Sequence, residues 1–298
     1  MNLKSKNGLL GEYTLSKERI DFSGKVYRYF LEFKVNKNEI KISYLKNDSG
    51  SNKKIYCFPG ILTNSLYFLP LLEHYNYSVI AFDDFNQGKS KGFPEGHTIL
   101  DSAKIIEFVS SVEGTADVLI GNSLGGYVVS EYFKKNSEKV KGLIMSNTAV
   151  DLDQLSEQLK MVFQNPEIAL GFLQMSRQQA GPLIQSFFNS KLEEKFFEEL
   201  IKSFKEIPDS ENKTFYNSII YGNEGKIQEL INGALSKNKE KVFVFYGEND
   251  QHIALLPAES NVYVYLLKEN FYMVKGSGHV IPYDKPEAFE KVLKSLLG

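Results

Sequence analysis

The stretch from Val118 to Lys135 reads VLIGNSLGGYVVSEYFKK and contains the pattern Gly-x-Ser-x-Gly. A short apolar run comes first, as in a buried strand, and apolar residues then recur at helical spacing. A serine between two glycines at a strand-to-helix turn is the arrangement that exposes a nucleophilic hydroxyl. A side chain in place of Gly121 or Gly125 would clash in so sharp a turn. We therefore predict that Ser123 is a nucleophile on a strained elbow.

Strands and helices alternate around this stretch. Strands are predicted over residues 54–58, 77–82, 117–121, 140–146, 241–246 and 270–274. Helices are predicted over residues 64–75, 98–112, 124–135 and 284–297. Such alternation is typical of an α/β fold, with a mainly parallel central sheet and helices on both faces. Two earlier strands, 27–35 and 39–45, alternate in polarity and are expected to form an antiparallel edge at the N-terminal end of the sheet.

The alternation stops at about Asp151, and only helical patterns follow until about Glu240. We predict a discontinuous core formed by residues 1–150 and 236–298. Residues 151–235 are predicted to form a helical cap, inserted after the sixth predicted strand. An insertion between two parallel strands lies over the carboxyl edge of the sheet, where α/β proteins bind their ligands.

The composition and the net charge argue against nucleic acid and a membrane as partners of this protein. A net charge of −2 gives no electrostatic basis for binding nucleic acid. The first residues lack the apolar centre of a signal peptide, and no apolar run is long enough to span a bilayer. The single cysteine, Cys57, lies in an apolar run and is expected to be a buried structural thiol. We expect a cytoplasmic protein that acts on a small molecule without a cofactor or metal; its oligomeric state stays open.

A serine hydroxyl needs a base, and the chain has four histidines. His279 follows the last predicted strand in a glycine-flanked loop, from which it can reach a neighbouring elbow, so we predict that it is the base. His252 is expected to start a helix near the site. His97 either lines the mouth of the site or serves at the start of a helix, and His74 ends an apolar helix.

The base in turn needs a carboxylate that fixes its tautomer. Asp250 lies on the loop after the strand 241–246, which gives the chain order Ser, Asp, His. We predict that Asp250 fills this role. Glu248 and Asp151 are the alternatives, and Asp250 has a purely structural alternative as the N-cap of a helix.

The negative charge that develops on an attacked carbonyl needs fixed hydrogen-bond donors. The backbone N–H of Leu124, directly after the nucleophile, is the first candidate. The N–H of Ile61 is the second, because Pro59-Gly60-Ile61 follows the strand 54–58 and Gly60 permits a close approach of the backbone. An ordinary Pro-Gly turn is the alternative for this segment.

Three segments together resemble the alpha/beta-hydrolase superfamily, in its branch of single-chain serine hydrolases with a cap. They are GNSLGG (residues 121–126), YGENDQ (residues 246–251) and GSGHVIPYDKPEAF (residues 276–289). The resemblance covers nearly the whole chain from about residue 25. A fourth segment, DDFNQGKS (residues 83–90), departs from the usual family pattern, with Phe85 and Asn86 where Arg and Gly are common. Pro59 also stands where members often carry His.

The resemblance implies a two-step acyl transfer through Ser123, His279 and Asp250. A carboxylesterase is the first expectation. Serine at the elbow argues against the branches that use an aspartate nucleophile, namely haloalkane dehalogenases and epoxide hydrolases. Carbon–carbon bond hydrolysis of diketone-type ring-cleavage products stays an alternative, as do thioesterase, lactonase and haloperoxidase activities. A ligand receptor or signalling regulator on the same fold is an alternative of a different class.

The cap range is rich in large apolar residues, which suggests an apolar pocket for a hydrophobic acyl or alcohol group. The alternative, which applies to most of them, is that they pack the cap helices together. The residues are Met161, Val162, Phe163, Leu170, Phe172, Leu173, Met175, Leu183, Phe187 and Phe188.

Overall fold

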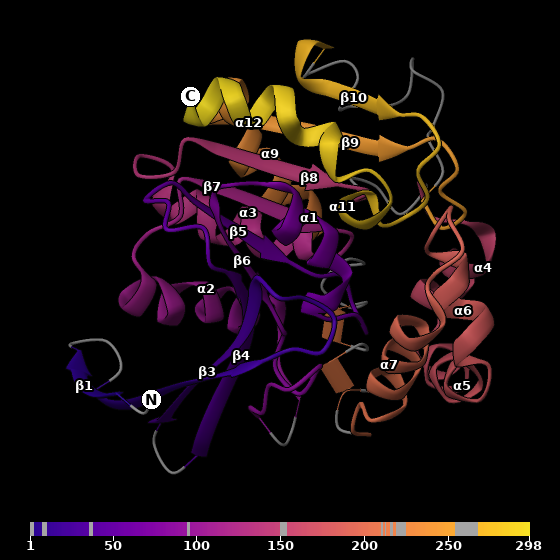
Figure 1. Cartoon of the computed structure of the whole chain (residues 1–298). Coiled ribbons are helices and arrows are strands. Elements are labelled where there is room, and N and C mark those ends of the chain that lie inside the picture. The colour runs from indigo at the N-terminus through magenta and orange to yellow at the C-terminus, as the bar shows by residue number, and fades with distance from the viewer. Residues whose placement is uncertain are drawn as a thin grey trace.

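A single mixed sheet organises the molecule (Figure 1). The computed structural model describes residues 3–7, 11–35, 38–93, 96–149, 154–209, 211, 213–214, 217–218, 225–253 and 268–298. In these residues ten strands pair in the order β1-β2-β3-β4-β6-β5-β7-β8-β9-β10. The order reverses around β5, as expected of a doubly wound sheet.

The second half of the sheet is parallel, as predicted. Its strands are β5 (Lys54–Phe58), β6 (Ser78–Phe82), β7 (Val118–Asn122), β8 (Gly142–Ser146), β9 (Val242–Gly247) and β10 (Phe271–Val274). All pairs among these six strands are parallel. Their bounds differ from the predicted ones by at most two residues at either end. The runs that form β5 to β9 are buried almost throughout, which is what a strand covered on both faces requires. The last strand, β10, lies at the edge of the sheet and has only Val274 buried.

The antiparallel edge is larger than predicted. It consists of β1 (Leu3–Asn7), β2 (Gly11–Arg19), β3 (Val26–Val35) and β4 (Asn38–Asn47), and β4 joins the parallel part through β6. The prediction missed β1 and β2 because β2 has no buried residue and therefore lacks the apolar pattern of a core strand. Its hydrogen bonds to β3 are what fix it. The helical insertion accordingly follows the eighth strand of the chain rather than the sixth.

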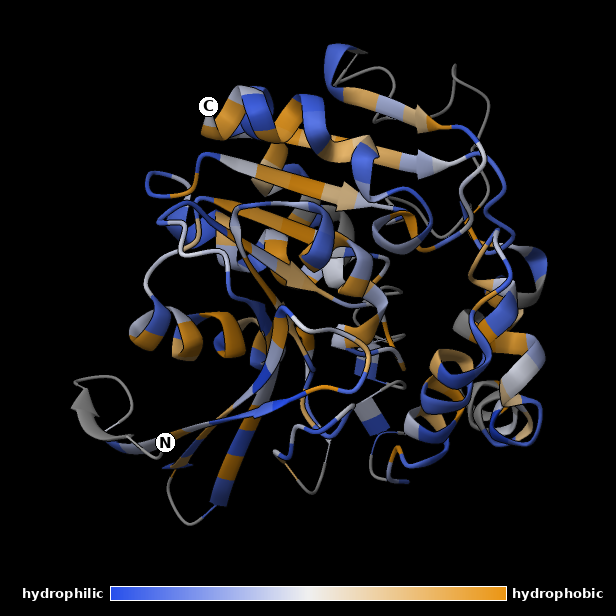
Figure 2. Cartoon of the chain, in the orientation of Figure 1, coloured by the Kyte–Doolittle hydropathy of each residue, from blue (hydrophilic) through white to orange (hydrophobic). Residues whose placement is uncertain are grey.

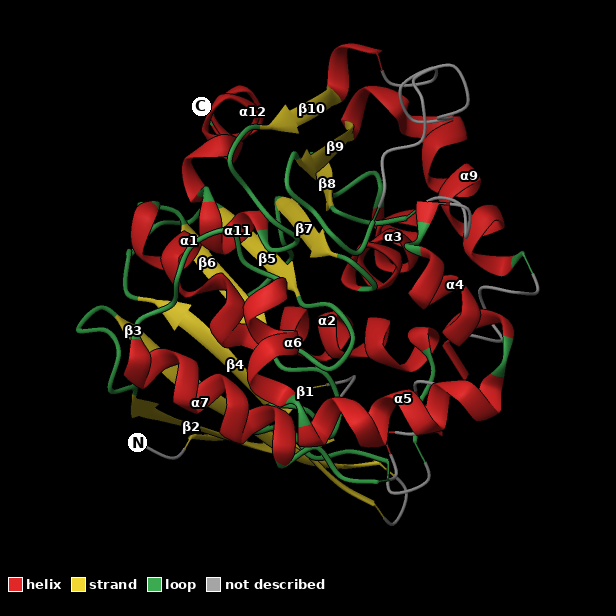
Figure 3. Ribbon diagram, turned by 90° about the vertical axis from the view of Figure 1, so that its right-hand side faces the viewer, coloured by secondary structure: helices red, strands yellow, loops and turns green. Residues whose placement is uncertain are grey.

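Helices cover both faces of the sheet (Figure 3). On one face lie α2 (Ile99–Glu113), α3 (Gly125–Asn136) and α9 (Lys226–Asn238), which contact one another in series. On the other face lie α1 (Leu69–His74), α11 (Ile281–Asp284) and α12 (Glu290–Leu297). Two apolar clusters result, one on each face, and Figure 2 shows the hydrophobic central strands between them.

The helix boundaries follow local capping chemistry. The helix predicted over residues 98–112 is α2, and a capping box of Thr98 and Asp101 is present at its start. The helix predicted over residues 284–297 is instead divided. Asp284 is the last residue of α11, and η5 (Pro286–Phe289) and α12 follow it. Pro286 has no N–H to donate and disfavours helix at the residue before it, so α11 ends at Asp284.

A helical insert lies between β8 and β9. Its helices are α4 (Glu157–Gln164), α5 (Pro166–Gln178), α6 (Ala180–Ser186) and α7 (Glu194–Lys205), followed by α9 on the sheet. We call α4 to α7 with the residues that connect them the helical insert. It lies beyond the carboxyl ends of the parallel strands (Figures 1 and 3). The stripe of Phe196, Leu200 and Phe204 on α7 is buried against the same apolar cluster as α1.

Candidate active site

Ser123 lies on a strained turn between β7 and α3. Its φ of 54° places it in the left-handed region, which costs a residue with a side chain about 1–3 kcal/mol. The surrounding backbone leaves no space: a Cβ on Gly121 would lie 2.4 Å from Gly125 O, and one on Gly125 would lie 2.2 Å from Phe58 O. The predicted elbow and the reason for its two glycines are therefore confirmed.

Two further loops bring a carboxylate and an imidazole to the same edge of the sheet. Asp250 follows β9 and His279 follows β10, and Asp250 Oδ2 lies 2.8 Å from His279 Nδ1. Because an ionised carboxylate can only accept, Nδ1 carries a proton, so the lone pair of the neutral ring is on Nε2. Asp250 Oδ1 accepts the backbone N–H groups of His252 at 2.8 Å and Ile253 at 3.1 Å. No helix starts at residues 251–253, so Asp250 caps a turn instead of a helix.

The Asp250 carboxyl stays ionised although it is almost fully buried. Burial by itself raises its pKa, but the charge of His279 and the hydrogen bonds from His279, His252 and Ile253 hold that pKa below its usual value. A buried carboxylate that accepts three hydrogen bonds is held in one orientation. It can therefore fix the tautomer and the ring position of His279.

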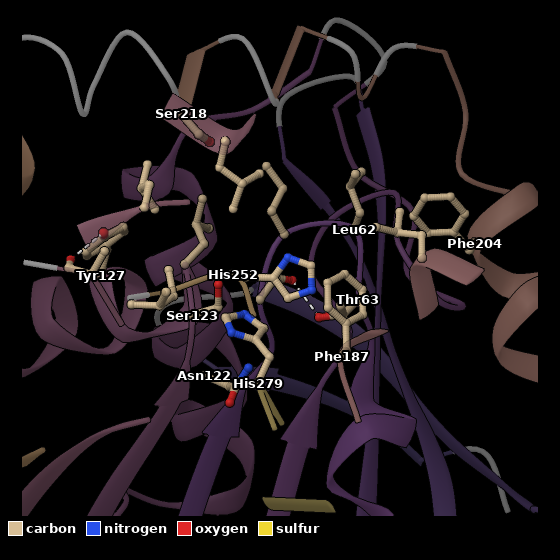
Figure 4. A pocket seen from close by; sticks show the side chains of 18 residues that line it. Leu62, Thr63, Asn122, Ser123, Tyr127, Phe187, Phe204, Ser218, His252 and His279 are labelled. Atoms are coloured by element: carbon tan, nitrogen blue, oxygen red, sulfur yellow. Dashed lines mark hydrogen bonds between the residues drawn. The ribbon is translucent and has the colours of Figure 1, made fainter. Parts of the chain in front are cut away.

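Ser123 and His279 line one cavity, and Figure 4 shows their side chains next to each other. Among the residues that the structure describes, the Ser123 hydroxyl has no hydrogen-bond partner. Hydrogen bonds between catalytic groups are often long without substrate and shorten when substrate binds.

The two predicted donors of an oxyanion hole also line this cavity. Ile61 and Leu124 approach it from opposite loops, and a Cβ on Gly60 would lie 3.0 Å from Ser123 Cβ. The loop of Gly60 is held by Thr63, whose hydroxyl donates to Gly60 O at 2.8 Å. In the described part of the chain neither the Ile61 nor the Leu124 N–H donates to a carbonyl, so both remain available to a ligand.

The cavity has a volume of about 110 Å³ and mostly apolar walls. Loops of the sheet form its floor and the helical insert forms part of its walls. Six of the apolar residues that line it are Leu62, Leu124, Leu159, Leu183, Phe187 and Phe204.

Of the apolar residues predicted for a pocket, some line the cavity and others do not. Leu183 and Phe187 line the cavity. Val162 and Phe188 are buried without lining it, while Met161 and Met175 are 57% and 46% exposed. The side chains of the other four lie outside the described residues: Phe163, Leu170, Phe172 and Leu173. The alternative expectation, that most of these residues do not line a pocket, therefore fits the described ones.

The alternative acids do not take the place of Asp250. The Glu248 carboxylate accepts the backbone N–H of Gly276 at 3.1 Å, and no contact joins it to His279 among the described residues. Asp151 lies outside the described residues.

The other histidines have distinct surroundings. His252 lines the cavity, and its Nε2 lies 3.0 Å from Ser186 Oγ of α6. His97 does not line it: it is buried with Nε2 3.2 Å from Asp84 Oδ2 and Nδ1 3.6 Å from Glu211 Oε1. Burial lowers the pKa of His97, but these two carboxylates outweigh it and raise that pKa to about 10. His74 ends α1, as predicted.

The departures from the family pattern in residues 83–90 have structural reasons. Asn86 has a φ of 58°, a conformation that asparagine tolerates better than other residues with side chains. The Asn86 amide binds Phe93 O and Glu211 Oε1, each at 2.8 Å. Arg28 of β3 donates to Asp83 Oδ2 at 2.6 Å, so a cation reaches this loop from a different strand.

Sequence reasoning missed Asn147, which follows β8 directly. Its side chain donates to the carbonyls of Gly278 at 3.0 Å and His279 at 2.8 Å, and accepts the N–H of Gly247 at 2.8 Å. Asn147 thus ties the histidine loop to the end of β9. Its position, a buried asparagine directly after a core strand, is the sequence signal that could have identified it.

In the described ranges, no group of three or more histidine, cysteine, aspartate or glutamate side chains is placed to hold a metal ion. None of the helices there combines the length and apolarity that a membrane crossing requires.

Comparison with known proteins places the chain in a family. The sequence profile described as alpha/beta hydrolase fold matches residues 54–286. Crystal structures with the same fold include wild-type Cfl2 from Burkholderia cenocepacia, with 14% identity, a TM-score of 0.74, and coverage of 95% of this chain and 99% of that chain. The haloalkane dehalogenase DbeA from Bradyrhizobium elkani has 13% identity, a TM-score of 0.70, and coverage of 95% and 97%. A thermophilic esterase from Thermogutta terrifontis has 16% identity, a TM-score of 0.62, and coverage of 100% of both chains. The sheet order, the elbow and the sequence profile agree, and the chain belongs to the alpha/beta hydrolase fold family.

Proposed function

We propose that this protein is a serine hydrolase that cleaves a carboxylic ester, or a related acyl bond, of a small hydrophobic molecule. The observation that carries the proposal is the 2.8 Å contact between Asp250 and His279 at the wall of a cavity that also contains Ser123. A left-handed serine on an elbow, with an imidazole of fixed tautomer beside it, matches the requirements of acyl transfer.

In the first step the Ser123 oxygen attacks the carbonyl carbon of the ester, and His279 Nε2 takes the hydroxyl proton. The N–H groups of Ile61 and Leu124 donate to the negative oxygen of the tetrahedral intermediate. Each such donor contributes about 10²–10³ in rate. The intermediate then expels the alcohol, which takes the proton from His279, and an acyl group stays on Ser123.

In the second step a water attacks the acyl carbon while His279 takes one of its protons. The new tetrahedral intermediate collapses, the carboxylic acid leaves, and the proton returns to Ser123. Asp250 keeps its charge throughout and stabilises the positive imidazolium. No cofactor or metal takes part in either step.

The cavity favours a short apolar group. Its volume of about 110 Å³ is smaller than a cavity of about 150 Å³ that takes up benzene. We propose that the cap expected over residues 151–235 consists of the helical insert, because α9 packs on the sheet with α3. We propose further that the carbonyl substituent lies between Leu183 and Phe204 of the helical insert and the elbow.

The test is turnover of p-nitrophenyl esters by the wild type and Ser123→Ala. We expect the variant to lose at least about 10⁴-fold in kcat, because the remaining groups cannot form the acyl intermediate. Ser236→Ala, which removes an exposed hydroxyl on α9, is the matched control and should retain full turnover. Circular dichroism checks that both variants fold, and substantial residual activity of folded Ser123→Ala would exclude Ser123 as the nucleophile.

Two alternatives make different predictions in the same assay. A carbon–carbon bond hydrolase would turn over diketones of the ring-cleavage type faster than any ester. A receptor or signalling regulator would release one equivalent of p-nitrophenol and then stall with an acyl group on Ser123. Repeated turnover of esters, with diketones inert, supports the esterase.

A further inference from the structure

His252 is a second histidine in the wall of the cavity. Its ring centroid lies 5.3 Å from that of His279 and 4.9 Å from that of Phe187. Figure 4 shows its ring among the side chains that surround the cavity. None of the steps above uses this imidazole, although it lies beside the histidine that would carry the proton.

The hydrogen bonds around His252 fix its tautomer. Its Nε2 lies 3.0 Å from Ser186 Oγ, and the Ser186 hydroxyl donates its only proton to Leu183 O at 2.7 Å. Ser186 Oγ therefore accepts from His252, so Nε2 carries the hydrogen. In a neutral imidazole the other nitrogen, Nδ1, is then a bare acceptor.

His252 is neutral at physiological pH. Burial lowers its pKa, and the neighbouring His279 lowers it further, while Asp250 and the Ser186 carbonyl oppose this; the result is a pKa of about 4. These are the charged or titratable groups that act on it from the acid loop, the histidine loop and the helical insert. The ring consequently presents an acceptor to the cavity and not a cation.

No group in the described part of the chain donates to His252 Nδ1. Two hydroxyl groups of the cavity have already placed their protons on backbone carbonyls: Thr63 donates to Gly60 O, and Ser218 donates to Thr214 O. A ring nitrogen with a lone pair and no partner, in an otherwise mostly apolar wall, binds a hydrogen-bond donor in preference to an alkyl group.

We propose that the substrate carries a hydrogen-bond donor, a hydroxyl or an amide N–H, close to its scissile carbonyl, and that His252 Nδ1 accepts it. This inference rests on the proposed esterase function and names the substrate class of that site. His252 is thus a specificity residue, and Ser186 of the helical insert is the residue that sets its tautomer.

The experiment compares matched pairs of esters that differ by one hydroxyl. One pair is p-nitrophenyl butyrate and p-nitrophenyl 3-hydroxybutyrate, with the hydroxyl in the acyl part. The other is propyl butyrate and 2-hydroxyethyl butyrate, with the hydroxyl in the alcohol part. We expect the wild type to prefer the hydroxylated ester of at least one pair by about tenfold in kcat/KM, the usual effect of one hydrogen bond in a desolvated site.

Two variants separate the acceptor from the contact with the helical insert. His252→Gln places an amide near the position of Nε2 and leaves none at Nδ1, so the preference should fall to about onefold. His252→Asn places an amide near Nδ1, so part of the preference should return. The ratio within each pair is compared for each variant, which removes any change in the overall rate.

The outcomes distinguish this inference from the proposed function. Turnover of the plain esters without a preference in either pair would overturn the role of His252 and leave the esterase intact. A preference that persists in His252→Gln would also overturn it. No turnover of any ester by the wild type would instead reject the proposed function. The imidazole nitrogen chemical shifts of the wild type give a check without activity, because a hydrogen on Nδ1 of His252 would contradict the proposed tautomer.

Discussion

The elbow around Ser123 and the helical insert meet at one cavity, but they differ in how much space surrounds their glycines. At the elbow, a single added carbon on Gly125 would lie 2.2 Å from a backbone oxygen. On α5 of the insert, a carbon added to Gly171 has nothing within 4 Å, and on α6 one added to Gly181 has its nearest neighbour at 3.6 Å. The position of Ser123 is thus set by contacts between backbone segments, whereas the insert contributes side chains that can change without moving Ser123.

Polar contacts add to the apolar packing that holds the insert on the core. At one end, Asn189 donates its backbone N–H to Asp284 at 3.0 Å and its side chain to Gly276 O at 3.1 Å, both in the histidine loop. Beyond the end of α7, Glu211 lies against His97 and Asn86 of the core. The helical insert is therefore docked on the segment that carries His279.

The largest expected effect is on the free energy of unfolding, when a methyl group is added at the elbow instead of in the insert. Gly125→Ala should destabilise the fold by about 3 kcal/mol or more, because its Cβ overlaps the backbone after β5. Gly171→Ala, inside a helix with open space around it, should stabilise by about 0.5–1 kcal/mol. Urea denaturation of both variants measures these changes. A Gly125→Ala protein as stable as the wild type would show that the elbow is not tightly confined.

A smaller effect should come from the wall of the cavity. Leu183→Ala removes part of that wall, so the ratio of kcat/KM for hexanoate over acetate esters should rise by about tenfold, the usual range for one or two methylene groups. Met175→Ala changes an exposed side chain of the same insert and should leave the ratio unchanged. An unchanged ratio in Leu183→Ala would mean that the acyl group lies elsewhere.

The smallest effect concerns the contact of Glu211 with His97. The pKa of His97 is about 10 in the folded protein, against about 6.5 in an unfolded chain. Its stabilisation is therefore full below about pH 6.5 and is lost as the pH rises to about 10. We expect the Tm of the wild type to exceed that of His97→Gln by about 2–4 °C near neutral pH, and the gap to shrink as the pH approaches 10.

Scanning calorimetry at several pH values checks this expectation. His74→Gln, at the exposed end of α1, is the matched control, because this histidine is exposed whereas His97 is buried. A gap between the wild type and His97→Gln that stays constant with pH would contradict a charged His97 between Asp84 and Glu211.

The sequence by itself determined the parallel half of the sheet and the order of the loops after it. Short apolar runs such as 54–58 and 118–120, bounded by turn residues, predicted buried strands, and Ser123, Asp250 and His279 follow such strands. Since the carboxyl ends of parallel strands share one edge, the meeting of these residues follows from local pattern and topology. The glycines at positions 121 and 125 likewise predicted a sharp turn, and the φ of 54° at Ser123 belongs to that turn.

Only the tertiary structure decided the features that depend on partners distant in sequence. Strand β2 has no buried face of its own and exists through its pairing with β3. The departure at Phe85 and Asn86 is explained only by Arg28 on another strand and by Glu211 beyond the end of α7. The tautomer of His252 is set by Ser186, which is 66 residues away. Such contacts arise from packing between elements, and no periodicity in the sequence encodes them.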